Sequence, residues 1–336
     1  MAKASVLLTT HPAFAAHDNG PGHPERPARL RAVLSGITAT GLGEAVVAVT
    51  PRPATRAELE GLHRAPYLDA LERFCAAGGG ALDADTEVVP ESWPAALLAA
   101  GAGPDAVERL DRGEADAAFL AVRPPGHHAL PGRAMGFCLL NNVAVTASVL
   151  ADRGERVLIV DWDAHHGNGT QDAFYGDGRV LYVSLHEYPL YPFSGRLDET
   201  GTGAGAGLTV NLPLPAGATG DVALAGLDEA VAPVVEAFAP TWLLVSAGFD
   251  GHRRDPLTGL GFSSGDFASL TRRVLEWAPP GRRLFFLEGG YDLEGLADSA
   301  GACVAGMAGV DHRPEPSTAG GPGRSVVDAA VLSRKA

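Results

Sequence analysis

The sequence has few cysteines, fewer basic than acidic residues, and no long apolar run. Its 3 cysteines, Cys75, Cys138 and Cys303, lie far apart without C-x-x-C spacing. This argues against a disulfide framework or a thiolate zinc site, and favours a reducing, cytoplasmic setting. The 26 basic and 40 acidic residues give a formal charge of −14, so the basic footprint of a nucleic-acid or membrane-surface binder is missing. No run approaches the roughly 18 apolar residues of a membrane span, and we expect neither a span nor a signal peptide.

The length and hydrophobic content indicate one large domain. A chain of 336 residues, of which 46% are hydrophobic, can bury a large core. We expect a single domain over residues 1–310. Residues 311–336 are polar and contain Pro314, Pro316 and the run Gly-Gly-Pro-Gly, so they are predicted to form a weakly ordered tail.

Apolar runs of strand length alternate with segments of helical spacing. The expected strands are residues 5–9, 117–122, 157–160, 180–185, 208–212, 242–247 and 284–287. The expected helices are residues 28–38, 63–75, 95–109, 141–151, 170–174, 222–238 and 264–277. This alternation predicts a three-layer α/β domain, with a mostly parallel central sheet flanked by helices.

Reactive side chains follow four of the expected strands. Residues 156–170, RVLIVDWDAHHGNGT, begin as an apolar run typical of a strand buried on both faces and end in carboxylates, imidazoles and an amide. Three other strands are followed by His127 and His128, by Asp250, and by Tyr291. Ligands of parallel sheets bind at the carboxyl ends of the strands, so we expect all four groups to meet at one edge.

Three of these side chains form a candidate metal site. Asp163 and His165 are two residues apart and point the same way in an extended chain, and Asp250 joins them from a neighbouring strand. Three protein ligands leave a coordination position open, which is typical of a catalytic zinc. The oxygen-rich set also suits Fe(II).

The adjacent imidazoles of His127 and His128 diverge and need separate partners. A carboxylate such as Asp161 would keep one imidazole charged, whereas the neutral amide of Asn168 would orient the other without raising its basicity as much. The phenol of Tyr291 follows two glycines and can donate a hydrogen bond to a developing oxyanion. These patterns predict an electrostatic role for one histidine and a base role for the other.

The motifs that carry these residues resemble the histone deacetylase family. They are RPPGHHA, GFCLLNN, VDWDAHHGNGTQDAF, SLHEYPLYP, SAGFD with DPLTG, and EGGYD, and the likeness runs from about His11 to Gly309. The resemblance implies the arginase/deacetylase fold, a mostly parallel eight-stranded sheet between helices. Asn168 and Glu288 resemble the class II branch and its bacterial relatives.

The resemblance also implies roles for individual residues in zinc-dependent amide hydrolysis. Zinc would be bound by Asp163, His165 and Asp250. His128 would act as general base and then acid, His127 would assist electrostatically, and Tyr291 would stabilise the oxyanion.

A structural potassium ion would bind near Asp161, Ser184 and Leu185, partly through backbone oxygens. The acyl-lysine tunnel would involve Gly136, Phe137, Tyr191, Leu257 and Gly289. Asp85 or Asp83 would grip the substrate backbone, and Arg26 would line an internal product channel.

Several functions remain open at this stage. The expected substrate is an acylated lysine of a protein or peptide, with an acetylpolyamine or another small acetylated amine as the alternative. The apolar Leu257, at a position where polyamine-specific relatives often carry an acidic residue, favours acyl-lysine. An arginase-like enzyme with two metal ions is less favoured, because Gly167 stands where its next carboxylate is expected. A non-catalytic acyl-lysine binding protein is less favoured because His128 and Tyr291 are present. An oligomer is compatible with the sequence.

Overall fold

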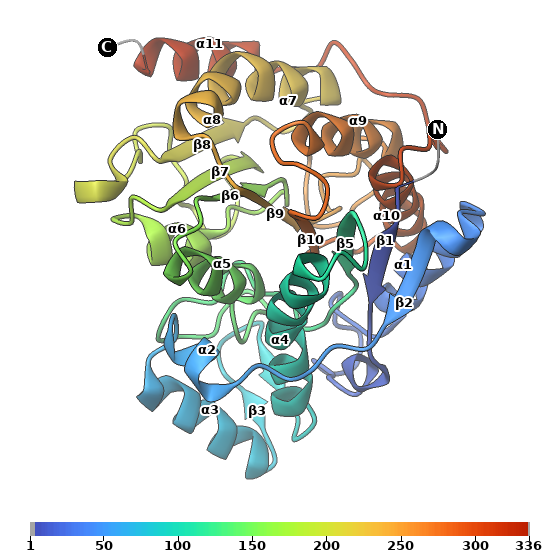
Figure 1. The fold of residues 1–336 in the computed structure, drawn as a ribbon, viewed down its shortest axis with the longest axis vertical. Helices are drawn as coiled ribbons and strands as arrows, with labels where there is room; N and C mark the ends of the chain where they lie inside the picture. Colours follow the sequence, from blue (N-terminus) through green and yellow to red (C-terminus); the bar gives the residue numbers. More distant parts are fainter. Residues whose placement is uncertain (1–3, 335–336) are drawn as a thin grey trace.

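The computed structural model describes residues 4–334 and has a parallel sheet of 8 strands at its centre, in the order β2-β1-β5-β10-β9-β6-β7-β8 (Figure 1). The strands are β1 (Val6–Thr9), β2 (Val46–Val49), β5 (Ala117–Leu120), β6 (Val157–Asp161), β7 (Val180–Glu187), β8 (Thr209–Leu214), β9 (Trp242–Ala247) and β10 (Arg283–Leu287). A short antiparallel pair, β3 (Gly80–Ala81) and β4 (Glu87–Val88), lies apart from it. Every residue of β5, β6, β7 and β9 is buried, as expected for strands covered on both faces.

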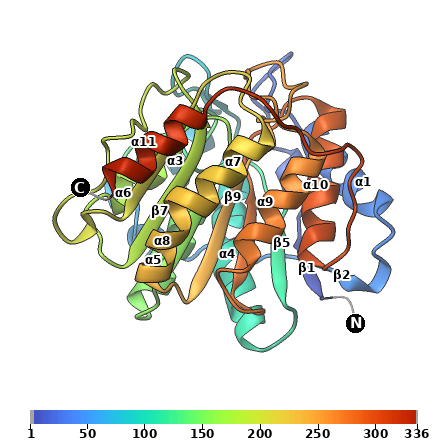
Figure 2. The ribbon, with the colours of Figure 1, turned by 90° about the horizontal axis from the view of Figure 1, so that it is seen from above.

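Helices cover both faces of the sheet (Figures 1 and 2). One layer contains α1 (Ala28–Ala39), α7 (Gly220–Gly226), α8 (Ala232–Phe238), α9 (Ser264–Leu275), α10 (Leu293–Met307) and α11 (Arg324–Ser333). The other contains α4 (Ser92–Asp111), α5 (Asn142–Asp152) and α6 (Asn168–Phe174), with α2 (Arg56–Glu60) and α3 (Ala65–Ala76) beside them. The predicted three-layer α/β fold is therefore confirmed. Within residues 4–334, no helix is long and apolar enough to cross a bilayer.

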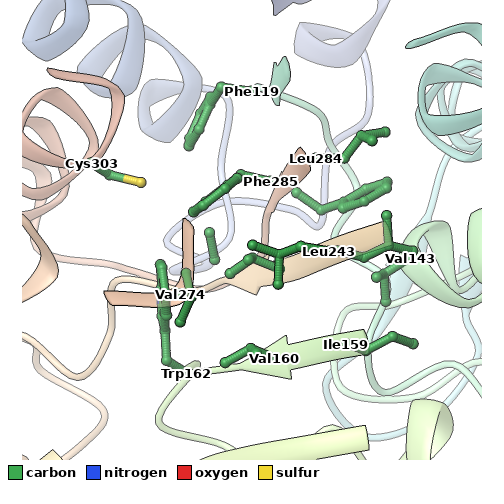
Figure 3. Close-up of a cluster of buried hydrophobic side chains, with 14 of the residues drawn as sticks. Phe119, Val143, Ile159, Val160, Trp162, Leu243, Val274, Leu284, Phe285 and Cys303 are labelled. Atoms are coloured by element: carbon green, nitrogen blue, oxygen red, sulfur yellow. The ribbon is translucent and has the colours of Figure 1, made fainter. Parts of the chain in front are cut away.

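The core lies between the sheet and the two helical layers (Figure 3). Phe119, Phe285 and Leu243 come from three adjacent strands, while Val143 of α5 and Cys303 of α10 approach from opposite layers. All of them are fully buried. At roughly 1.5–3 kcal/mol for each large apolar side chain removed from water, this continuous core fixes the sheet as a rigid base for the loops at its edge.

Two predicted segments have a structure different from the one expected, and β2, α2 and α10 form outside the expected strands and helices. The helix expected over residues 222–238 is interrupted by a π-helical turn, Leu227–Val231, before α8. Pro233 lacks the N–H that would continue the α-helical ladder at that point. The expectation of a weakly ordered tail is not met either, because α11 forms and buries Val327 and Ala330 against the body of the protein. The proline and glycine content of residues 314–323 suggested disorder, but it instead shapes an ordered connection.

The strand order determines where the site forms. β5, β10, β9, β6 and β7 are consecutive neighbours near the middle of the sheet. Their carboxyl ends therefore bring together segments that are far apart in the sequence, including every reactive group singled out above.

Candidate active site

The loops that follow these central strands enclose a cavity of about 250 Å³. Its lining residues are Asp85, Pro125, His127, His128, Gly136, Phe137, Cys138, His165, Leu190, Tyr191, Leu257, Gly289 and Tyr291. Most of the predicted site residues thus line one cavity. Pro125, Cys138 and Leu190 were not singled out beforehand, although each adjoins or lies within a motif that was.

Asp163, His165 and Asp250 converge on one point beside this cavity. Their potential ligand atoms all lie within 4.8 Å of one another, and within residues 4–334 they form the one such group of three or more acidic, histidine or cysteine residues. His165 Nδ1 is 3.2 Å from Asp163 Oδ1 and 2.9 Å from Asp250 Oδ2. Burial and the Asp163 carboxylate raise the pKa of Asp250 to about 7. For Asp163, the charges of His127 and His165 outweigh burial and lower the pKa, so only the charge of Asp250 is incompletely compensated.

Backbone donors hold the two carboxylates in place. Asp163 Oδ2 accepts from the N–H of Gly289 at 2.8 Å, and Asp250 Oδ1 accepts from the N–H of Ala164 at 2.7 Å. Gly248 leaves room for this packing, since a Cβ there would lie 2.1 Å from Asp163 Oδ2. One oxygen of each carboxylate is thus fixed, and the other faces His165. This donor set fits a divalent cation such as zinc, held by one imidazole and two oriented carboxylates.

His127 is paired with a buried carboxylate. Its Nδ1 lies 3.0 Å from Asp161 Oδ2, which also accepts from the hydroxyl of Tyr182 at 3.2 Å. Burial alone would lower the pKa of His127, but the charges of Asp163 and Asp161 outweigh it and raise that pKa to about 10. His127 is therefore charged near neutral pH.

His128 has a neutral partner. Its Nδ1 lies 2.8 Å from Asn168 Oδ1. An amide oxygen only accepts, so Nδ1 carries the ring proton and Nε2 keeps its lone pair. Burial, together with the charges of His127 and His165, lowers the pKa of His128 well below its usual range. The two adjacent histidines thus differ in charge, as their proposed partners predicted.

Glu288 holds the turn that carries both histidines. This fully buried carboxylate accepts from the N–H of Gly126 at 2.7 Å and of His127 at 3.2 Å, and from the hydroxyl of Ser246 at 3.2 Å. It links the ends of β5, β9 and β10. In the sequence it stood out only as a subfamily marker, because its partners, two backbone N–H groups and the hydroxyl of Ser246, are distant along the chain.

Tyr291 is held from two sides. Its N–H donates to Asp255 Oδ2 at 2.7 Å, and the guanidinium of Arg29 lies 5.0 Å from the centre of its ring. Burial raises the pKa of the phenol well above its usual range, so it stays protonated as a donor.

Arg29 also donates to the carbonyl of Gly290 at 2.6 Å. Arg26 is exposed, so its expected place in an internal channel is wrong, and Arg29 lies beneath the site instead.

Comparisons with known proteins place this chain in a family. The profile of the Histone deacetylase domain matches residues 23–307. The chain belongs to the histone deacetylase family. It is 40% identical over 311 residues to a probable deacetylase of Archaeoglobus fulgidus, covering 90% of this chain and 86% of that protein. It is 37% identical to the chloroplastic histone deacetylase 10 of Oryza sativa, covering 88% of this chain and 71% of that protein. The crystal structure of the HDA15 HD domain superimposes with a TM-score of 0.89 and 34% identity, over 99% of this chain and 93% of that one.

The mouth of the cavity in this histone deacetylase family member is made by loops. Tyr191 packs edge-on against His128 with ring centres 5.4 Å apart, and Phe137 packs edge-on against Tyr291 at 6.0 Å. Phe137 has a φ of +67°, a left-handed conformation that is costly for a bulky residue. Asp85 is half-buried at the rim. Asp83 is exposed, does not line the cavity, and accepts from the N–H of Asp85 at 3.1 Å.

Asp161, Ser184 and Leu185 lie together behind the cavity. Asp161 and Ser184 are direct neighbours in the register of β6 and β7, and both are fully buried with Leu185. The hydroxyl of Ser184 lies 2.8 Å from His186 Nδ1. His166 bonds to Ser194 at 2.8 Å and Gln171 at 3.0 Å, away from the cavity. This region supplies buried oxygens next to the three-residue cluster.

Proposed function

We propose that this chain is a metal-dependent amidohydrolase that removes acetyl or other acyl groups from lysine side chains. One observation carries the proposal. One charged and one neutral histidine, a protonated tyrosine and a three-residue metal-ligand set border one cavity of about 250 Å³. An amide hydrolase needs these groups together: an activated water, a base and a donor to the oxyanion.

Asp163, His165 and Asp250 would hold the metal, with zinc preferred and Fe(II) as the alternative. When bound there, the metal would lower the pKa of water and polarise the acyl carbonyl. A structural potassium ion would bind near Asp161, Ser184 and Leu185, where side-chain and backbone oxygens are buried.

The remaining steps fall to side chains of the cavity. His128 Nε2, unprotonated because Nδ1 faces Asn168, takes a proton from the attacking water and then gives it to the departing amine. His127, charged through Asp161, stabilises the negative charge that develops on the substrate. The phenol of Tyr291 donates to the same oxyanion, a contribution of about 2.7–4 kcal/mol at such positions.

The mouth favours a long acylated side chain as substrate. Phe137 and Tyr191 provide aromatic walls for a methylene chain, and Asp85 offers an acceptor at the rim for a peptide N–H. Leu257 is 38% exposed and apolar, so it gives no charge to the second ammonium of an acetylpolyamine. Acyl-lysine is therefore the first candidate and a small acetylated amine the second. The net charge of −14 suits an acetylpolyamine or a peptide with other basic residues. With its three buried free cysteines, the chain is expected to work in the cytoplasm.

Other functions fit the site less well. At Gly167, a Cβ would lie 2.2 Å from Asp161 Oδ2, so a carboxylate that bridges a second metal ion has no room there. This disfavours an arginase-like two-metal enzyme. A non-catalytic acyl-lysine binding protein would not require both His128 and Tyr291 at the cavity.

The test is a substrate panel with the purified full chain before and after metal removal. Acetyl-lysine peptides, longer acyl-lysine peptides and acetylpolyamines are each incubated with protein that has been stripped by a chelator and then reloaded with zinc. We expect hydrolysis of acyl-lysine peptides that disappears on chelation and returns with about one zinc ion per chain. Activity indifferent to the chelator, or a requirement for two ions per chain, would overturn the proposal.

A further inference from the structure

The segment after α10 crosses the helical layer as a strap, defined here as residues 311–323. In Figure 2 it runs in front of α9 and α10 toward α11. It begins beyond residue 307, where the match to the family profile ends. Thr318 Oγ1 donates to Asp266 Oδ2 at 2.7 Å, and the N–H of Gly320 donates to Asp221 Oδ2 at 3.0 Å. The strap is thus attached to the starts of α9 and α7.

One side chain of the strap reaches toward the candidate active site. Glu315 Oε2 accepts from His252 Nε2 at 2.7 Å and from the N–H of Ser264 at 3.2 Å. Its other oxygen accepts from Arg253 at 2.8 Å. The N–H of Glu315 donates to the hydroxyl of Ser264 at 3.1 Å, so the residue is fixed by both its backbone and its carboxylate.

His252 connects Glu315 to the loop after β9. Its side chain is 1% exposed and packs against the first turn of α10, where a Cβ at Gly295 would lie 2.7 Å from its Nδ1. The carbonyl of His252 accepts from the N–H of Asp255 at 2.7 Å. Asp255 in turn accepts from the N–H of Tyr291 at 2.7 Å. A continuous series of contacts therefore runs from the strap to the residue that carries the phenol.

The same loop begins at a metal-ligand candidate. Asp250 lies two residues before His252, and the N–H of His252 bonds to the carbonyl of Phe249 at 3.2 Å. Thr258 donates to the carbonyl of Asp250, which closes the loop on itself. Outside itself the loop bonds to the backbone of Phe262 and of Tyr291. The buried contact of His252 with Glu315 connects it to the strap.

We propose that Glu315 is a positioning residue that fixes, through His252, the loop from Asp250 to Leu257, and so sets the positions of Asp250 and of the Tyr291 turn. The inference rests on the proposed function to the extent that these two residues serve the reaction. It assigns a role in the site to a segment outside the matched family domain.

The test compares Glu315→Ala with Glu315→Gln, whose amide oxygen still accepts from His252, and with Thr318→Ala as a matched control on the same strap. Zinc affinity of the stripped full chain is measured against a competing chelator, hydrogen exchange is followed over residues 251–262 and 289–292, and kcat and KM are measured on an acetyl-lysine peptide. We expect Glu315→Ala to weaken zinc binding about tenfold, to speed exchange in both segments and to lower kcat with KM unchanged. Glu315→Gln should retain most of each property, and Thr318→Ala should match the wild type.

The outcomes separate the inference from the proposed function. If Glu315→Ala and Thr318→Ala lose only thermal stability, and to a similar degree, Glu315 is merely structural and the inference fails. If the wild type hydrolyses no substrate, the proposed function fails, while zinc affinity and exchange still decide the role of Glu315. If Glu315→Ala does not fold, Glu315→Asp, which keeps the charge but shortens the side chain, should show an intermediate loss of zinc affinity. Wild-type affinity in that variant would overturn the inference.

Discussion

The floor and the mouth of the cavity are built differently. Floor residues such as Asp161, Asp163 and Asp250 lie at the ends of central strands, are almost fully buried, and accept from backbone or side-chain donors. The mouth is made by loops, and Leu257 there is 38% exposed while nearby Phe193 is 71% exposed. The positions of the floor groups are thus fixed by the sheet, whereas the mouth groups lie on loops and are partly exposed. Substitutions in the floor should change turnover, and those in the mouth should change selectivity.

The largest effect is expected from removal of a single hydroxyl at the floor. Tyr291→Phe keeps the ring over Arg29 but removes the donor to the oxyanion. We expect kcat to fall on the order of a hundredfold or more, because one such donor contributes about 10²–10³ in kcat. Metal content should stay at the wild-type level. Steady-state kinetics and metal analysis, with Tyr175→Phe as a control away from the cavity, check this, and unchanged kcat would remove the phenol from the mechanism.

A smaller effect is expected from changing the charge of the partner of His128. In the wild type, burial and the charges of His127 and His165 hold the pKa of His128 well below its usual range. We therefore expect the proposed base to be unprotonated at neutral pH. Asn168→Asp places a carboxylate at Nδ1 and favours the protonated ring. In this variant His128 therefore becomes protonated, and stops acting as a base, at a higher pH than in the wild type.

The measurement is the pH profile of kcat/KM. We expect the acid limb of Asn168→Asp to move upward by about one pH unit or more, with metal content unchanged. Asn168→Ser, a neutral partner, should leave the limb near its wild-type position. A limb that stays in place or moves down in the aspartate variant would contradict a base role for His128.

Sequence patterns predicted the floor well for a physical reason. A strand buried on both faces needs an uninterrupted apolar run, so its end is sharply marked where polar residues begin, at Asp161 in β6 and just after β9 at Asp250. Parallel strands then place these ends on one edge. β2 was not predicted, although its sequence VVAV is an apolar run; the strand is short, lies at the edge of the sheet and is partly exposed.

Contacts that depend on distant backbone groups were harder to predict. Glu288 and Glu315 bond mainly to groups that are close only in the folded chain. Arg29 is different, because it shares a helical face with the buried Val33 and Ile37. This spacing could have distinguished it from the exposed Arg26, which was chosen instead. The order of residues 311–334 was missed because it arises from contacts with α9, α7 and β8 and not from local propensity.

The smallest effect is expected at the mouth. Leu257→Glu adds a carboxylate at a partly exposed position beside the cavity, where it can pair with the second ammonium of an acetylpolyamine. A partly exposed ion pair contributes up to about 1 kcal/mol, so the ratio of kcat/KM for acetylpolyamine to that for acetyl-lysine peptide should rise by about fivefold. Leu257→Gln, of the same size but uncharged, should leave the ratio near the wild-type value. If glutamate and glutamine change the ratio equally, the mouth selects by shape and not by charge. If either variant lowers kcat on the peptide as strongly as Tyr291→Phe, the division between floor and mouth is wrong.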